Sequence, residues 1–235
     1  MFDGLTRGNI GRYVVREIGC PRANDARVKV IEADGHRAIF KDMGGAHPFF
    51  RRMLGRRLIA REFAIYRALD GVEGVPRAYR MIDRDGFLIE HIDSVRLRRK
   101  DIRRGAKVPP EVYERCMRLV GEMHRRCIVH FDLRNRKNFL FDKDGRVYLV
   151  DFASAVRVPA WLPFRKGLVS LLGLFDRAGV LKMKRLLSPE QLTPGERRFL
   201  ARFEFVRSIL FPPALVRRIM RRRCRDRGRE KEKAT

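Results

Sequence analysis

Two oxygen-bearing side chains in the middle of the chain have the types and spacing of a metal site. Asn138 begins the β-rich segment NFLF, and Asp151 lies near the end of the next one, RVYLVDF, with the turn pair Asp144-Gly145 between them. A two-residue Asp-Gly hairpin pairs residues equally far from the turn, which predicts that Asn138 lies opposite Asp151. Amide and carboxylate oxygens suit Mg²⁺, which completes its shell with water and phosphate. Taken alone, a turn cap and a solvated strand end explain these two residues better.

The segment before this hairpin adds groups that could act on a phosphate. Asp132 lies six residues ahead of Asn138, in the sequence HFDLR. In that position a carboxylate could receive the proton of a hydroxyl that attacks a metal-bound phosphate. Arg134 is a fixed cation that could offset charge developing on the transferred group. His130 is better explained as a packed core histidine than as a catalytic one.

A third set of residues could hold further phosphates. Lys41 ends the strand-like segment HRAIFK, and Glu62 lies on the apolar side of the next helical segment, with Leu58, Ile65 and Leu69. A carboxylate on a buried face needs a partner, because an unpaired buried charge is costly. Lys41 is the natural partner. For each residue alone there is an equally good explanation: Glu62 could lie in water at the edge of the apolar stripe, and Lys41 could be an ordinary lysine at a strand end.

The elements that carry these residues are predicted from turn pairs and apolar spacing. Each of three Asp-Gly pairs separates two β-rich segments, which is a strong hairpin signal. Helical spacing of apolar residues runs over 58–69 and 112–127, and only helical periodicity remains after residue 157. The order of hairpins and helices indicates an α+β protein in two lobes. The turn pairs are Asp34-Gly35, Asp85-Gly86 and Asp144-Gly145.

Composition limits the kind of protein. The chain has 235 residues, 45% of them apolar, which excludes wholesale disorder. Its formal charge of +26 predicts attraction to an anionic partner such as nucleic acid, phospholipid or nucleotide. Four scattered cysteines do not indicate a disulfide scaffold or a zinc module, and they fit a reducing compartment. No signal-peptide core is present and the longest apolar stretch, 167–175, is too short for a bilayer. We therefore expect a cytoplasmic protein.

The order of the functional groups resembles the protein-kinase-like fold: a strand lysine, a helix glutamate, His-x-Asp, Asn and Asp-Phe. Within that fold the chain looks most like small bacterial kinases related to lipopolysaccharide core (Kdo/heptose) kinases, with RIO-type kinases next. The phrases that carry this resemblance are REFAIYRALDGVEGVPRAYR, HFDLRNRKNFLF and YLVDFASA. The resemblance implies a β-rich N-lobe over 1–91, a reduced helical C-lobe over 92–212 and a basic tail over 213–235.

Roles in nucleotide binding follow from the resemblance. Lys41 would bind the α- and β-phosphates of ATP, and Glu62 would orient it. The segment FLIEHI resembles the hinge strand whose backbone meets adenine. Within it, Glu90 and Ile92 are the residues assigned to the nucleotide.

Roles in phosphoryl transfer follow in the same way. Asp132 would align the substrate hydroxyl and Arg134 would steady the transferred group, while Asn138 and Asp151 would hold Mg²⁺. Five residues separate Asp132 from Asn138, where the kinase loop has four. Asn135 is therefore a rival ligand, although the hairpin and the following apolar residues favour Asn138.

Other features depart from the kinase pattern. Phe131 replaces the usual arginine, so control through a phosphorylated activation loop is not expected. Asp151-Phe152-Ala153 lacks the usual glycine, and no A-P-E sequence follows. Only Gly19 stands where a glycine-rich loop would precede the first hairpin. The peptide-binding part of a protein kinase is thus expected to be trimmed.

The leading functional hypothesis is an ATP- and Mg²⁺-dependent phosphotransferase acting on a hydroxyl of an anionic sugar lipid such as lipopolysaccharide core. The alternative is an atypical RIO-like serine/threonine protein kinase. A further alternative, from a different class, is a nucleotide-binding pseudokinase or basic nucleic-acid adaptor.

Basic and apolar segments predict where the chain could meet other surfaces. The run 94–107 and the tail could contact anionic lipid headgroups, which would bring the protein to the inner face of the cytoplasmic membrane. Residues 161–175 could lie at a membrane interface, but a buried core helix is the preferred interpretation. Aromatic residues do not alternate with the arginine runs, so nucleic acid is a less favoured partner.

Overall fold

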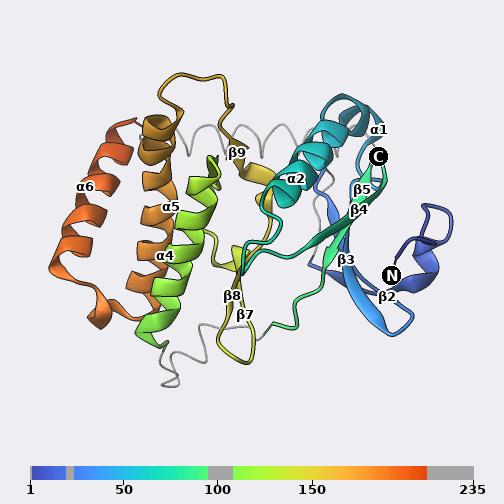
Figure 1. The fold of residues 1–235 in the computed structure, drawn as a ribbon, viewed down its shortest axis with the longest axis horizontal. Coiled ribbons are helices and arrows are strands. Elements are labelled where there is room, and N and C mark those ends of the chain that lie inside the picture. The colour runs from blue at the N-terminus through green and yellow to red at the C-terminus, as the bar shows by residue number, and fades with distance from the viewer. Residues whose placement is uncertain (1, 20–23, 95–107, 211–235) are drawn as a thin grey trace, which may run out of the picture.

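The computed structural model describes residues 2–19, 24–94 and 108–210. A five-stranded antiparallel sheet occupies one side of the molecule, and the helices α4, α5 and α6 occupy the other (Figure 1). The α+β, two-lobed kinase-like fold is therefore confirmed. Almost all of the basic run 94–107 and the whole tail 213–235 lie outside the described residues, as do Cys20 and Cys224. Cys116 and Cys127 are buried and free.

The sheet positions Lys41 at its centre. Its strands are ordered β1-β2-β3-β5-β4, and each pairs antiparallel with its neighbour. Lys41 is in β3, opposite Val28 of β2 and Phe87 of β5. A position between two strands fixes its backbone from both sides. The strands are β1 (Val14–Ile18), β2 (Arg27–Ala33), β3 (His36–Asp42), β4 (Ala78–Asp83) and β5 (Gly86–Glu90).

The first two Asp-Gly pairs differ from each other in where the hairpin turn lies. Asp34 and Gly35 both have positive φ, 51° and 73°, and Ala33 pairs with His36. This is the two-residue hairpin that the sequence predicts. In the second hairpin Asp83 pairs with Gly86, so the turn lies one residue earlier than predicted and Gly86 begins β5. A side chain at Gly86 would lie 2.7 Å from the carbonyl oxygen of Lys41, which explains the glycine by close strand approach.

The third hairpin corrects the predicted register. Phe139 pairs with Leu149 and Phe141 with Val147, which shifts every partner by one residue. Asp142 and Arg146 bracket a three-residue loop in which Gly145 has φ 71°. Such a loop, with a left-handed glycine at its last position, is the next most common hairpin after the two-residue form.

The shifted register moves the candidate ligands relative to each other. The N–H of Val150 donates to the carbonyl of Asn138 at 2.9 Å, so Val150, not Asp151, lies opposite Asn138. The predicted direct pairing was therefore wrong. The hairpin strands are β7 (Phe139–Phe141) and β8 (Val147–Leu149).

A second short strand pair links the segment before Asp132 to the chain after Asp151. Ile128 of β6 pairs with Arg157 of β9, and Val129 pairs with Val156. Single turns of 3-10 helix precede β7 and β9. The elements are β6 (Ile128–Val129), η3 (Arg136–Asn138), η4 (Phe152–Ser154) and β9 (Val156–Arg157).

The helices bury the faces that their spacing predicts. In α2, Glu62 and Ile65 are buried and Leu58 is half-buried; in α4, Cys116 and Met123 are buried. Because these positions recur at helical spacing, one stripe of each helix faces the core. The helical elements are α1 (Pro48–Phe50), the π-helix η2 (Arg51–Gly55), α2 (Arg56–Ala68), α4 (Pro110–Arg125), α5 (Arg165–Leu187), η5 (Pro189–Gln191) and α6 (Pro194–Leu210).

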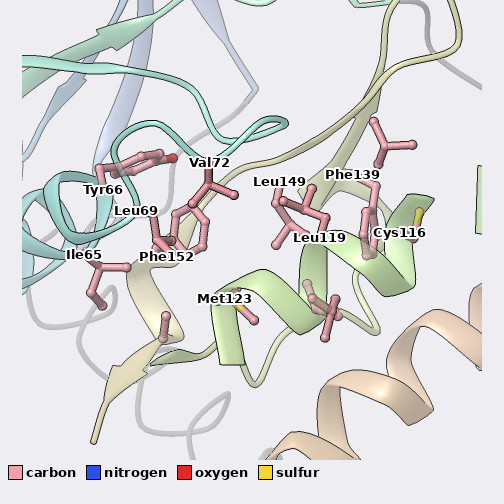
Figure 2. Close-up of a cluster of buried hydrophobic side chains, with 14 of the residues drawn as sticks. Ile65, Tyr66, Leu69, Val72, Cys116, Leu119, Met123, Phe139, Leu149 and Phe152 are labelled. Atoms are coloured by element: carbon pink, nitrogen blue, oxygen red, sulfur yellow. The ribbon is translucent and has the colours of Figure 1, made fainter. Parts of the chain in front are cut away.

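One apolar cluster joins the sheet side to the helical side. Tyr66 of α2 and Leu69, directly after it, pack with Phe152, while Leu119 and Met123 of α4 belong to the same cluster (Figure 2). Burying a side chain of this size stabilises the fold by about 1.5–3 kcal/mol. The cluster therefore fixes α2 against the chain that carries Asp151.

A smaller apolar cluster on the other side of the sheet was not anticipated. Phe2, Leu5 and Ile10, from the start of the chain, pack on Phe40. Strand β1 was missed as well, because its sequence VVREI carries no turn pair at its start.

The segment 161–175 is a core helix only in part. Helix α5 begins at Arg165, and Val169 and Gly173 on one side of it are buried. Trp161 and Phe164 precede the helix and are exposed. The preferred core-helix interpretation was wrong for these two residues, since the loop turns them outward. Within the described ranges no helix is long and apolar enough to cross a bilayer.

Candidate functional site

Lys41 lies between two carboxylates. Its Nζ is 2.5 Å from Oε1 of Glu62 on α2 and 2.9 Å from Oδ1 of Asp151 after β8. Lys41 and Glu62 are only 7% and 3% exposed. A buried ion pair of this kind requires that both partners be held by rigid elements, here a central strand and a packed helix.

Electrostatics reinforce the charged state of this group. Burial lowers the pKa of Lys41, but the carboxylates of Glu62 and Asp151 outweigh it and leave the pKa raised. The Lys41 ammonium lowers the pKa of Asp151. Burial raises the pKa of Glu62, and Lys41 opposes that shift. With one cation against two carboxylates, the group carries an excess of negative charge.

Asp151 adopts an unusual backbone conformation. Its φ is 67° and its ψ is 67°, in the left-handed region that non-glycine residues rarely occupy. The N–H of Asp151 donates to Oη of Tyr66 at 3.1 Å, and the ring of Tyr66 meets that of Phe152 edge-on at 4.8 Å. These contacts hold the strained residue so that its side chain, 47% exposed, faces Lys41.

Asn138 is hydrogen-bonded to Asp132. Its Nδ2 donates to the backbone oxygen of Asp132 at 2.9 Å and to Oδ2 of Asp132 at 3.1 Å. Asn135 instead caps η3, its side chain accepting from the N–H of Lys137 at 3.3 Å. The turn of 3-10 helix accommodates the extra residue between Asp132 and Asn138. Of the two asparagines, Asn138 therefore lies with Asp132.

Asp176 of α5 supports the backbone just before Asp132, and no sequence pattern predicted this role. It is fully buried, and its carboxylate accepts from the N–H groups of His130 and Phe131, both at 2.8 Å. Nε2 of His124 is 2.9 Å away. Phe131 has φ 65°, a strained value for an aromatic residue, and the Asp176 carboxylate fixes it. The available signal was a single carboxylate directly after the apolar stretch 167–175, where it marks the end of that stretch.

A close helix approach completes this support. A side chain at Gly179 of α5 would lie 2.8 Å from the carbonyl carbon of Leu133. Only glycine lets the helix backbone come this near the segment that carries Asp132. Helix α5 therefore packs directly against the backbone of the segment that carries Asp132.

Arg134 is not brought to this group. Its guanidinium lines a small recess with Lys182 of α5 and with Phe203 and Glu204 of α6. Burial lowers the pKa of Arg134, and the nearby arginine Arg207 adds to that shift. The structure therefore does not bring Arg134 to Lys41 and Asp151, and its contact with a transferred phosphoryl group stays a prediction.

The hinge residues lie at and after the end of β5. The N–H of Glu90 donates to the carbonyl of Arg77 at 2.9 Å, and its side chain accepts from the N–H of Arg77 at 3.0 Å. Ile92 is half-buried and follows the strand without regular structure. The amide of Glu90 is thus already occupied within the protein.

His130 is a core residue, as predicted. It is fully buried and its ring packs at 5.1 Å from that of Phe152. Burial lowers the pKa of its imidazole, which favours the neutral form.

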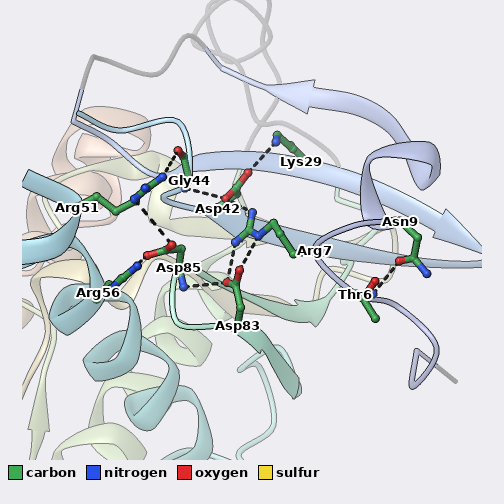
Figure 3. Close-up of polar contacts among 10 residues, drawn as sticks. All are labelled: Thr6, Arg7, Asn9, Lys29, Asp42, Gly44, Arg51, Arg56, Asp83 and Asp85. Atoms are coloured by element: carbon green, nitrogen blue, oxygen red, sulfur yellow. Dashed lines mark hydrogen bonds and ion pairs between the residues drawn. The ribbon is translucent and has the colours of Figure 1, made fainter. Parts of the chain in front are cut away.

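A second charged group lies on the opposite face of the sheet. Asp42 follows Lys41 in β3, and successive strand residues point to opposite faces. Its carboxylate meets Arg7 at 2.6 Å and Lys29 at 2.8 Å, and Arg7 also binds Asp83 through two nitrogens (Figure 3). This group ties the start of the chain to the sheet, and no sequence pattern predicted it.

Comparison with known proteins shows a similarity over part of the chain. A probable bifunctional tRNA threonylcarbamoyladenosine biosynthesis protein from Methanospirillum hungatei is 31% identical over 147 residues. The match covers 57% of this chain, and the chain spans about a quarter of that protein, 26% of its length. No family model matches the sequence.

Proposed function

We propose that the chain is an ATP- and Mg²⁺-dependent phosphotransferase of the atypical, RIO-like kinase type. The observation that carries this proposal is the position of Lys41 between Glu62 and Asp151, together with the hydrogen bonds from Asn138 to Asp132. A strand lysine oriented by a helix glutamate is the arrangement that binds nucleotide phosphates in kinases.

The donor set fits the cofactors. Lys41 offers a cation for phosphate, and Asp151 and Asn138 offer the carboxylate and amide oxygens that would hold Mg²⁺. Among residues 2–19, 24–94 and 108–210, no three His, Cys, Asp or Glu side chains gather as a complete metal cage. Mg²⁺ commonly binds through one or two carboxylates plus substrate phosphates, so a partial set is what it needs. Bound Mg²⁺ would neutralise charge on the phosphates, and the excess of negative charge around Lys41 favours a divalent cation.

In this proposal the protein contributes position and electrostatics. Glu62 keeps Lys41 charged and aimed at the phosphates. Asp132 accepts the proton of the attacking hydroxyl, and Asn138 fixes the orientation of its carboxylate through the 3.1 Å hydrogen bond. Arg134 has no part, because its guanidinium lies beside α5 and α6.

A protein acceptor is favoured over a sugar lipid. The relative is named for a role in tRNA modification, and its name includes no lipid function. This fits the RIO-like protein kinase, in which positive charge on the protein would attract a ribosome or another acidic assembly. The sugar-lipid acceptor remains as a second candidate because exposed aromatic residues lie beside arginines near the start of α5.

The decisive assay follows transfer of labelled γ-phosphate from ATP into separated protein and lipid pools. The test variant is Asp132→Asn, and the matched control is Asp144→Asn, which changes an aspartate in the β7–β8 loop and keeps a good turn pair. The proposal expects label in protein, lost in Asp132→Asn and retained in Asp144→Asn. Label only in lipid would favour the second candidate. Equal labelling by both variants, or none by the unaltered chain, would contradict phosphotransfer and favour a binding protein.

A further inference from the structure

A cavity lined by arginines lies at the junction of α4, β9 and α5. It measures about 490 Å³, and its lining includes Arg125 and Arg126 at the end of α4, Arg157 of β9 and Arg165 of α5. Four arginines around one recess concentrate positive charge there, which an anion between them would offset. Each presents planar donors that match the oxygens of a phosphate.

Little in the protein neutralises this charge. Glu122 pairs with Arg125 and with Arg126, the latter at 3.0 Å. Across the described part of the chain, neither Arg157 nor Arg165 has an ion pair or a side-chain hydrogen bond. The cavity thus keeps a net positive charge that is open to an external anion.

Two large aromatic side chains stand beside the cavity. Pro159 and Ala160 line it, and the next residue, Trp161, is 80% exposed. Phe164, directly before Arg165, is 91% exposed. They are the two most exposed large apolar side chains in the described part of the chain, and they lie three residues apart beside the same recess.

The loop that carries these aromatics is folded. Leu162, between them, packs against a small apolar cluster that includes Val158 and Val169. The N–H of Leu162 donates to the carbonyl of Pro159, and Phe164 has φ 57°. Because the loop is anchored through Leu162 while its neighbours point outward, the exposure is a property of the structure.

We propose that Trp161, Phe164 and the four arginines form a docking surface for an anionic phospholipid bilayer. The cavity would take a lipid headgroup phosphate, and the two aromatic rings would enter the interfacial layer, where tryptophan is enriched. Leu171, 62% exposed and two turns along α5 from Phe164, extends the apolar part of the surface. An aliphatic side chain adds affinity for lipid but offers no face for stacking a nucleobase, which favours the bilayer over RNA.

Trp161 is the single tryptophan of the chain, so its fluorescence reports on this surface alone. The unaltered chain is mixed with vesicles of phosphatidylglycerol and phosphatidylcholine in equal parts, and separately with phosphatidylcholine alone. Binding is measured by the emission shift of Trp161 and by sedimentation. We expect a blue shift and co-sedimentation with the anionic vesicles only.

Matched variants assign the binding to this surface. Arg157→Gln/Arg165→Gln should lower partitioning about thirty-fold, because each cation near an anionic surface contributes about a factor of five. Phe164→Ser, which keeps the probe, should lower it about tenfold. The control Arg198→Gln/Arg202→Gln removes two exposed arginines from α6 and should leave partitioning within about twofold, since they lie outside the cavity. Circular dichroism checks that each variant is folded.

Several results would overturn the proposal. The control could lose as much affinity as Arg157→Gln/Arg165→Gln, which would make the attraction a diffuse effect of net charge. Emission already blue-shifted without vesicles would mean that the chain itself or a second copy covers Trp161. Quenching by single-stranded RNA without any vesicle response would assign the surface to nucleic acid.

Discussion

Two adjacent residues of β3 form opposite charged groups on the two faces of one sheet. Lys41 is a cation between two carboxylates, Glu62 and Asp151, whereas Asp42 is a carboxylate between two cations, Arg7 and Lys29. Both central residues are buried. The strand alternation that places them on opposite faces also gives them different surroundings.

The difference between the groups lies in what their partners can do. Asp42 accepts from Arg7, from Lys29 and from the N–H of Gly44, and these bonds satisfy both of its oxygens (Figure 3). Burial opposes its ionisation, but Lys29 and Arg7 outweigh burial and lower the pKa of its carboxyl. Around Lys41, by contrast, the half-exposed Asp151 carries charge that one cation does not balance. The group around Asp42, whose hydrogen bonds are all made within the protein, stabilises the fold. The group around Lys41, whose charges do not balance, can bind a ligand.

The largest expected effect comes from Lys41→Met. Loss of the cation removes the phosphate contact and leaves Glu62 buried without a partner. We expect phosphotransfer to fall by about 10³-fold, a loss typical of removing a group that stabilises developing charge. The measurement is labelled γ-phosphate transfer at saturating ATP. A variant that retains more than a tenth of the activity would show that Lys41 is not part of the site.

Asp42→Ala should have the converse result. Its removal leaves Arg7 and Lys29 without this carboxylate. We expect the unfolding free energy to fall by about 2 kcal/mol and by no more, because Arg7 keeps its contacts with Asp83 and with water. Urea denaturation measures the loss. Transfer activity measured well below the denaturation midpoint should change by less than about threefold. A loss of activity comparable to that of Lys41→Met would remove the distinction between the two groups.

The support beneath Asp132 can be tested with two glycines of the same helix. Gly179→Ala places a methyl group against Leu133 and should cost about 2 kcal/mol. Gly167, exposed near the start of α5, has open space around it, so Gly167→Ala should stabilise the helix by about 1 kcal/mol. Thermal unfolding measures both. If Gly179→Ala unfolds at as high a temperature as Gly167→Ala, helix α5 does not pack closely against the segment that carries Asp132.

The smallest expected effect is on how the unfolding free energy changes with pH. Burial lowers the pKa of His130 in the folded state, so the stability that its neutral form contributes is complete above about pH 6.5 and declines as the pH falls below that value. His130→Phe should flatten the decline in unfolding free energy between pH 6.5 and 5. Urea titrations at several pH values measure the slope. An unchanged slope would mean that another group titrates there.

Local patterns predicted much of the fold. The turn at Asp34-Gly35, the buried stripes of α2 and α4 and the core position of His130 all follow from spacing within a few residues. The ion pair between Lys41 and Glu62 followed because a carboxylate on an apolar stripe requires a cation.

The remaining errors have long-range or geometric causes. The register of β7 and β8 depends on whether Asp144-Gly145 forms a two- or three-residue loop, and the sequence allows both. Asp176 is far in sequence from the amides that it accepts from, so no local pattern links them. Arg134 lines a recess with α6, a helix whose position the sequence did not predict, and its role in phosphoryl transfer stays a prediction.

ATP affinity with and without Mg²⁺ tests the central claim most directly. Calorimetry on the unaltered chain, Asp151→Asn and Asp42→Asn compares one aspartate from each charged group of β3. We predict that Mg²⁺ strengthens ATP binding to the unaltered chain and to Asp42→Asn, and that this gain disappears in Asp151→Asn. An equal gain in all three proteins would show that Asp151 does not hold the metal and would contradict the account.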